Sequence, residues 1–131
     1  MKLLSMTPEL IVKDVSETIE FYEKNLGFTV SLKVPEDGEP VWAELKNGEL
    51  RFMVQKWDDT IVEMPRLSAR QRGGITIFVF RLSTTSEVRK IAELFTDGYD
   101  IPLPLRTTEY GTVEFGISDP DGYLIIFSSE E

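Results

Sequence analysis

The hydrophobic and polar positions of the chain follow one plan twice. Each half opens with an apolar run typical of a strand, continues with an amphipathic helix and ends with three further strand-like runs. The strands expected in the first half are Glu9–Lys13, Phe28–Val34, Val41–Lys46 and Glu49–Trp57. Those expected in the second half are Ile75–Leu82, Ile101–Arg106, Thr112–Ile117 and Tyr123–Ser128. A repeat of this kind predicts two halves of the same architecture packed together.

One amphipathic helix is expected in each half. The first begins at Asp14 and ends at Gly27, which suits the left-handed conformation that closes many helices. The apolar residues of its buried face are Val15, Ile19, Tyr22 and Leu26. The second follows the hydroxyl-rich run 83–86 and stops at Asp97-Gly98. Its buried stripe is Val88, Ile91, Ala92 and Phe95. The plan predicts an α+β fold in which two βαβββ modules form a curved mixed sheet with the helices on its convex side.

Two tight turns are predicted from their residues. Asn47-Gly48 stands between two strand-like runs, which is a signal for a type I′ hairpin turn. The run 119–122, Asp-Pro-Asp-Gly, joins the last two strands. Pro120 fits its first central position, and Gly122 can take a positive φ. Such turn chemistry predicts hairpins but no function.

A polar stretch near the middle of the chain separates the two halves. Asp58-Asp59-Thr60 and the run 68–74 have the composition of a connecting segment. We therefore expect a single domain of two modules, at about 1–60 and 74–131, joined by a connector at about 61–73.

Period-two alternation sorts the strand side chains of the first half into two faces. Leu50, Phe52 and Val54 form an apolar set that should meet the helix. The same side is expected for Val41, Ala43 and Leu45. The intervening positions, together with one residue of the second half, should then line the concave side: Trp42, Glu44, Arg51, Met53, Gln55 and Tyr110.

This set mixes aromatic walls with a few charged groups, which is the usual lining of a small-molecule pocket. The competing interpretation is structural. Trp42 and Met53 would then fill the core or a subunit interface, and Glu44 and Arg51 would form a cross-strand surface pair.

Composition narrows the chemistry that these residues can perform. The chain has no histidine and no cysteine, so histidine general-base catalysis is excluded and no disulfide framework can form. We therefore expect a cytoplasmic protein. The net charge of −9 disfavours nucleic acid and anionic membranes as partners and is compatible with a cationic ligand. No apolar run approaches the roughly 18 residues needed to span a bilayer.

Two blocks of sequence carry a resemblance to a known family. Residues 8–28, PELIVKDVSETIEFYEKNLGF, and the Asp-Pro-Asp-Gly turn at 119–122 occur together with the repeated βαβββ plan. In this combination the chain resembles the vicinal-oxygen-chelate superfamily, which includes glyoxalase I, extradiol dioxygenases and bleomycin-resistance proteins. The resemblance covers nearly the whole chain.

The resemblance also implies where a metal would be held. Enzymes of this family bind a divalent cation with four side chains, usually histidine and glutamate, and these positions fall near Thr7 and on Met53, Ile75 and Ile126. None of them supplies imidazole, carboxylate or thiolate, so we expect no metal, no cofactor and no metal-dependent catalysis. One alternative is an off-pattern Mn²⁺ or Mg²⁺ site built from Glu9, Glu44 and Glu114.

Within the superfamily the chain is most similar to the bleomycin-resistance branch, through residues 110–115, YGTVEF, followed by the turn at 119–122. The likeness gives Tyr110 the position of a stacking tryptophan and adds Ile77 and Glu114 to the expected ligand-binding residues. Val113 stands where that branch has an arginine. Tyr110 and Ile77 also carry less aromatic area than the tryptophans expected there, which argues against bleomycin itself as the ligand.

The residues and the resemblance together predict a metal-free small-molecule-binding protein that sequesters an antibiotic or another toxic compound. One alternative is a lyase, isomerase or dioxygenase-like enzyme that uses the carboxylate metal site or metal-free acid-base chemistry. Its acid-base residues would be Glu44 or Glu114, with Arg51 or Tyr110. Another is a regulatory module whose concave face docks a peptide. A homodimer is expected in each case, because a second chain would cover open sheet edges and an apolar hollow.

Overall fold

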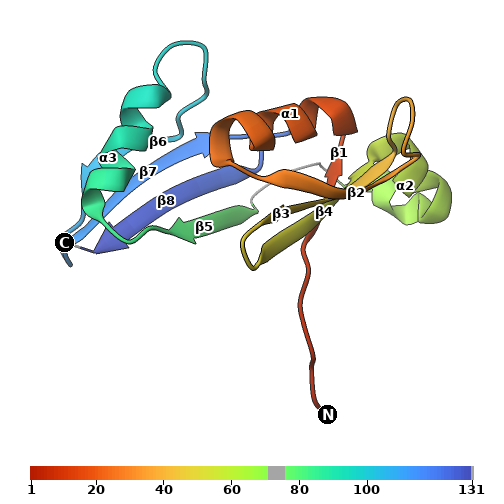
Figure 1. Cartoon of the computed structure of the whole chain (residues 1–131), viewed down its shortest axis with the longest axis horizontal. Helices are drawn as coiled ribbons and strands as arrows, with labels where there is room; N and C mark the ends of the chain where they lie inside the picture. The colour runs from red at the N-terminus through yellow and green to blue at the C-terminus, as the bar shows by residue number, and fades with distance from the viewer. Residues whose placement is uncertain (71–75, 131) are drawn as a thin grey trace. The chain divides into compact units, whose positions relative to one another are not determined.

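The computed structural model describes residues 1–70 and 76–130 (Figure 1). The chain divides into two compact units, unit 1 (Met1–Arg72) and unit 2 (Gly73–Glu131). Each unit contains one four-stranded mixed sheet and a helix that packs on one of its faces. The predicted α+β class and the repeated βαβββ plan are therefore confirmed. In the part of the chain that the structure describes, no helix is long and apolar enough to cross a membrane.

Unit 1 has the strand order β1-β4-β3-β2, with β1 parallel to β4 and the other pairs antiparallel. Its strands are β1 (Glu9–Val12), β2 (Thr29–Val34), β3 (Trp42–Asn47) and β4 (Leu50–Lys56). Its helices are α1 (Val15–Leu26), α2 (Trp57–Glu63) and the 3₁₀ helix η1 (Pro65–Ala69). The residues before β1 run out from the sheet as an extended segment (Figure 1).

Helix α1 is closed at both ends as its sequence predicts. The Asp14 carboxylate accepts a hydrogen bond from the Glu17 backbone N–H, and Gly27 takes the left-handed conformation with φ 69°. The helix buries Tyr22 against Phe28 and Phe52, with ring centroids 5.9 and 4.8 Å away. The sheet residues in this core are Leu10, Val12, Ala43, Leu45, Phe52 and Val54. One face of the sheet therefore packs against α1, and the opposite face is available for other contacts.

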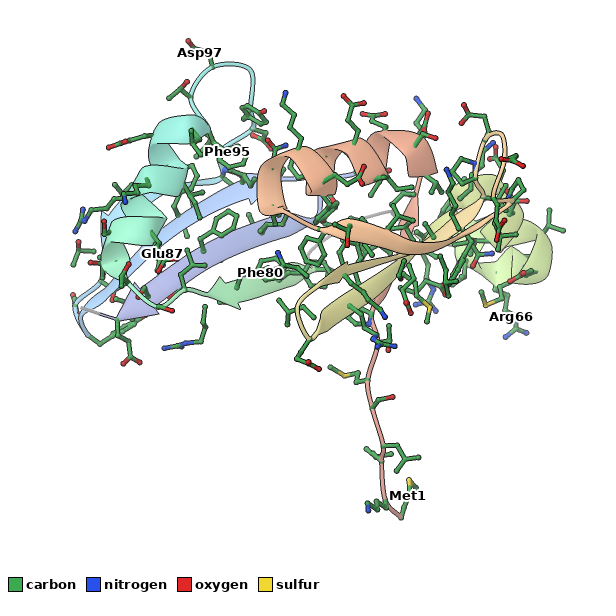
Figure 2. The ribbon with its side chains drawn as sticks, in the orientation of Figure 1. Met1, Arg66, Phe80, Glu87, Phe95 and Asp97 are labelled. Carbon is green, nitrogen blue, oxygen red and sulfur yellow. The ribbon has the colours of Figure 1, made fainter. Side chains whose placement is uncertain are left out.

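Unit 2 repeats this arrangement with the strand order β5-β8-β7-β6, in which β5 is parallel to β8. Its elements are β5 (Ile77–Arg81), α3 (Thr85–Leu94), β6 (Leu103–Thr107), β7 (Thr112–Ser118) and β8 (Leu124–Glu130). The Thr84 hydroxyl caps α3 by accepting from the Glu87 backbone N–H. Figure 2 shows Phe95 at the end of α3, where its ring lies 6.3 Å from that of Phe115.

The turn between β7 and β8 confirms its prediction. The Gly122 N–H donates to the Asp119 carbonyl at 3.0 Å, which places Pro120 at the first central position. Gly122 has φ 89°. The Asp119 carboxylate also accepts from the backbone N–H groups of Asp121 and Tyr123. The turn is thus held by its own aspartate, in keeping with a structural role.

Three local predictions about unit 1 are wrong. The β3–β4 loop consists of Gly48-Glu49, because Asn47 pairs with Leu50, and only Gly48 has a positive φ. A type I′ turn needs two positive φ values, so that assignment fails. The alternation predicts that Leu50 packs against the helix, but Leu50 is 52% exposed at the start of β4. The predicted strand Glu49–Trp57 ends at Lys56, and Trp57 begins α2.

Part of the predicted connector is helical. Residues 58–63 belong to α2 and residues 65–69 to η1, because Trp57, Ile61 and Leu67 supply apolar positions within a polar composition. Residues 71–73 of the predicted connector, and Ile75, lie outside the described residues. In unit 2, α3 ends at Leu94 with Phe95 as its C-cap, so Asp97-Gly98 forms a later turn and does not stop the helix.

Candidate functional site

The face of the unit 1 sheet opposite α1 carries most of the predicted site residues. Five of the eight lie there on β3 and β4, and the register places them as neighbours. Trp42 is paired with Gln55, and Glu44 with Met53, while Glu9 of β1 lies beside Met53 on the other side. We call this surface the polar face of unit 1; its residues are Glu9, Trp42, Glu44, Arg51, Met53 and Gln55.

Glu44 is the most enclosed charged group of the polar face. Its side chain is 9% exposed, and its Oε1 accepts a 2.7 Å hydrogen bond from the Ser31 hydroxyl on β2. The Lys46 Nζ lies 3.9 Å from Oε1, and an Arg51 guanidinium nitrogen lies 3.8 Å from Oε2. The side chains of Lys46 and Arg51 are 40% and 52% exposed, far more than the carboxylate. Solvent therefore screens their electrostatic attraction to Glu44.

Trp42 forms the aromatic part of the polar face. Its indole Nε1–H donates a 3.1 Å hydrogen bond to the Glu9 carboxylate. The side chain is half-buried, which leaves part of the ring open to solvent. Met53 and Gln55, which are also half-buried, point to the same face from the strand between Trp42 and Glu9. A carboxylate, an aromatic ring and a thioether thus share one surface.

The three remaining predicted residues lie in unit 2 and do not form a comparable group there. Tyr110 is 80% exposed in the turn between β6 and β7. Glu114 on β7 is held by the Arg106 guanidinium, with nitrogen–oxygen distances of 2.9 and 3.2 Å. Ile77 and Val79 are 52% and 56% exposed on β5. They share their face with Leu124 and Ile126 of β8, which together form an apolar group, and the register places the Arg106–Glu114 pair on the same face.

A groove of about 690 Å³ lies in unit 2 between α3 and β6. Phe95 and Phe115 are among the residues that line it, and Arg89 and Glu93 of α3 line it as well. None of the eight predicted site residues does so. The groove is on the helix side of the sheet, and it is therefore separate from the face that carries Ile77 and Glu114.

The positions expected to hold a metal in the family's enzymes do not fit one here. Thr7, Met53 and Ile126 are half-buried but offer a hydroxyl, a thioether and a hydrocarbon, and Ile75 lies outside the described residues. Within residues 1–70 and 76–130, no three side chains of histidine, cysteine, aspartate or glutamate gather to hold a cation. Hard and borderline metal ions need carboxylate, imidazole or thiolate ligands.

Sequence reasoning missed the partners that hold the site residues in place. The sequence suggests Glu9 only as a possible metal ligand, but its carboxylate accepts a hydrogen bond from the Trp42 indole N–H. Ser31, Lys46 and Arg106 are absent from the predicted site, although Ser31 and Lys46 contact Glu44 and Arg106 contacts Glu114. The even spacing of Glu44, Lys46 and Trp42 on β3 could have identified Lys46, because residues two apart share a face. The other partners depend on register between strands.

Comparisons with known proteins agree with this architecture. A model of the Glyoxalase/Bleomycin resistance protein/Dioxygenase superfamily matches residues 4–127. No curated protein matches the chain well enough to count as a relative. Among solved structures, a hypothetical protein from S. aureus is similar with a TM-score of 0.78 and 18% identity, over 98% of this chain and 95% of that one.

Two further solved structures have the same fold. A glyoxalase/bleomycin resistance protein/dioxygenase from Nocardioides has a TM-score of 0.76 at 19% identity, covering 99% of this chain and 85% of the other. A bleomycin-binding protein from Streptomyces verticillus, complexed with copper(II)-bleomycin, has a TM-score of 0.62 at 19% identity, over 100% and 99% of the two chains. At these identities the likeness shows the fold alone. The match over residues 4–127 shows the family: the chain belongs to the glyoxalase/bleomycin resistance protein/dioxygenase superfamily.

Proposed function

We propose that this chain is a small-molecule-binding protein that holds its ligand without transforming it, and that it sequesters an antibiotic or another toxic compound. The observation that carries the proposal is the polar face of unit 1, where the half-buried ring of Trp42 lies two residues from the nearly buried carboxylate of Glu44 on the same strand. Such a pairing of apolar area with a few fixed polar groups is typical of ligand sites. The apolar side chains at Met53 and Ile126 support binding over metal-assisted catalysis.

The charge of the chain favours a cationic ligand. The net charge of −9 attracts cations over a long range, and Glu44 supplies a nearby acceptor. The neighbour from Streptomyces verticillus is described as a complex with copper(II)-bleomycin, which is an example of this fold in a ligand-bound form. Val113, which stands in place of that branch's arginine, is fully buried on the helix side of unit 2. It therefore offers no ligand contact, and we propose a ligand other than bleomycin.

Isothermal titration with three planar tricyclic probes tests the proposal. We expect cationic proflavine to bind more tightly than neutral acridine, and anthracene-9-carboxylate to bind most weakly, because the field of the protein repels anions. Addition of EDTA should leave the proflavine affinity unchanged, and the dye should be recovered intact. Affinity that disappears with the chelator, or conversion of the probe, would favour the enzymatic alternative. Absence of binding by all three probes would contradict the proposal.

We also propose that the protein forms a homodimer. The edge strand β5 exposes Ile77 and Val79, and the edge strand β2 exposes Leu32 and Val34. Exposed apolar side chains on unpaired edges are a hazard that a second chain would cover. Light scattering after size-exclusion chromatography should give the mass of two chains, and Val79→Lys should lower it. Val62→Lys, at an exposed apolar position of α2, is the matched control. A single-chain mass for the unaltered protein at micromolar concentration would contradict this proposal.

A further inference from the structure

We infer that the indole of Trp42 lies flat across strand β4 as a stacking platform, and that Glu9 is the positioning residue that holds it there. The inference rests on the proposed function, because it assigns a ligand class to the same polar face: a planar aromatic molecule. Its starting point is the single hydrogen bond from the Trp42 Nε1–H to the Glu9 carboxylate, at 3.1 Å.

The strand order determines how far this hydrogen bond must reach. Trp42 is on β3 and Glu9 is on β1, and β4 lies between these two strands. Adjacent strands are about 4.8 Å apart, so the two backbones are separated by about 10 Å. Side chains that stood upright from the sheet could not close this gap. Both must lean over β4 for the two atoms to meet.

The register gives the position of the ring along β4. Trp42 is paired with Gln55, whereas Glu9 is paired with Met53, the residue two positions earlier on the same strand. The hydrogen bond therefore crosses β4 diagonally, above the side chains of Met53 and Gln55. The indole N–H lies in the plane of the ring, so this plane contains the direction of the hydrogen bond, and the half-burial of Trp42 fits a ring with one face toward β4 and the other away from it. A ring in this position offers a planar apolar surface parallel to the sheet.

Glu9 suits a positioning role better than a recognition role. Its carboxylate accepts from the edge of the indole, so it restrains the rotation of the Trp42 side chain without covering a ring face. A pre-oriented aromatic ring loses less conformational freedom when a ligand stacks on it. Aromatic stacking tolerates many planar partners, because each of them has a π face. Glu44 lies two residues from Trp42 on the same strand face and can then select among planar ligands by charge.

Nuclear magnetic resonance of the ligand-free protein tests the restraint on the ring. With Trp57→Phe as background, Trp42 gives the single indole N–H signal. Glu9→Ala should speed hydrogen exchange of that proton by about 3- to 10-fold, the factor expected for loss of one hydrogen bond. It should also lower the fluorescence anisotropy of the indole. Glu9→Gln keeps an acceptor oxygen and should stay close to the unaltered protein. Glu20→Ala, on the exposed side of α1, is the matched control and should change nothing.

Ligand titration tests the consequence for binding. Glu9→Ala should weaken proflavine and neutral acridine by a similar factor, about 3- to 10-fold, because a looser ring affects any planar ligand. Glu9→Gln should restore most of the affinity for both. If Glu9→Gln weakens proflavine as much as Glu9→Ala and leaves acridine unaffected, Glu9 acts through its charge and the positioning role is wrong.

The two measurements separate this inference from the function on which it rests. Unchanged hydrogen exchange and anisotropy in Glu9→Ala would overturn the restraint, whatever the titrations give. An exchange response in a protein that binds none of the probes would keep the restrained ring and contradict the proposed function. An exchange response together with unchanged affinities in Glu9→Ala would show that the ring is not the stacking platform, which would overturn the assigned ligand class.

Discussion

Trp42→Ala should weaken proflavine binding by about 10-fold or more, the factor that corresponds to loss of one aromatic stacking contact. The substitution removes the aromatic ring of the polar face and leaves the Glu9 carboxylate without its indole donor. Core packing should change little, because the ring is half-buried on the face opposite α1. Isothermal titration gives the change in affinity, and urea denaturation gives the free energy of unfolding.

A second tryptophan provides the control for this experiment. Trp57 begins α2, outside the polar face, so Trp57→Phe should leave the proflavine affinity within about twofold of the unaltered protein, the scale of a surface substitution. Equal losses from Trp42→Ala and Trp57→Phe would place the binding site elsewhere. A Trp42→Ala protein with unaltered affinity would remove the polar face from the proposed function.

The features of the fold that could be predicted from the sequence are those fixed by neighbouring residues. Asp14 and Gly27 close α1 through contacts within the same turn, and the 119–122 turn is held by its own aspartate. The alternation of Phe52 and Val54 with Met53 follows from the pleat of a single strand. Each of these signals is complete within a few residues, so no knowledge of the tertiary fold is needed.

Two of the missed contacts join residues that are far apart in sequence. The Trp42–Glu9 hydrogen bond joins residues 33 positions apart and needs the parallel register of β1 with β4. The Ser31–Glu44 hydrogen bond follows from an irregularity in the β2–β3 pairing, between Val30 and Leu32. The alternation of residues along one strand predicts neither hydrogen bond. The candidate residues could therefore be predicted, but the contacts that orient them could not.

The sequence repeat does not indicate that the two sheets carry different residues on the faces opposite their helices. In unit 1 the face opposite the helix carries Glu44, Arg51 and Trp42, while in unit 2 the corresponding face carries the exposed Ile77 and Val79 as well as Glu114. Both follow the same βαβββ plan, because the plan depends on the helix-facing residues alone. Residues on the second face are free to differ without loss of the fold. The small-molecule recognition that we propose involves the polar face of unit 1, and the intersubunit contact that we propose involves the exposed apolar residues of the edge strands.

Gly116→Ala should destabilise the protein by about 1–3 kcal/mol, the usual cost of forcing extra volume into a packed site. Gly116 is buried in β7, and a Cβ there would lie 2.9 Å from the Leu103 Cβ and 3.4 Å from the Ile125 carbonyl oxygen. Its backbone is not in the positive-φ region, so the cost comes from the contact and not from conformational strain. Urea denaturation measures the loss, and Gly116→Val should exceed it.

A double-mutant cycle identifies the contact that is responsible. The atom nearest to the added methyl group is the Cβ of Leu103, which Leu103→Ala keeps and Leu103→Gly removes. Gly116→Ala combined with Leu103→Gly should therefore cost less than the sum of the single changes, by more than about 0.5 kcal/mol. The same change combined with Leu103→Ala should be additive, because the close approach persists. Additivity in both pairs would contradict the assignment to Leu103. The responsible contact would then be the one with the Ile125 carbonyl oxygen, which no side-chain substitution removes.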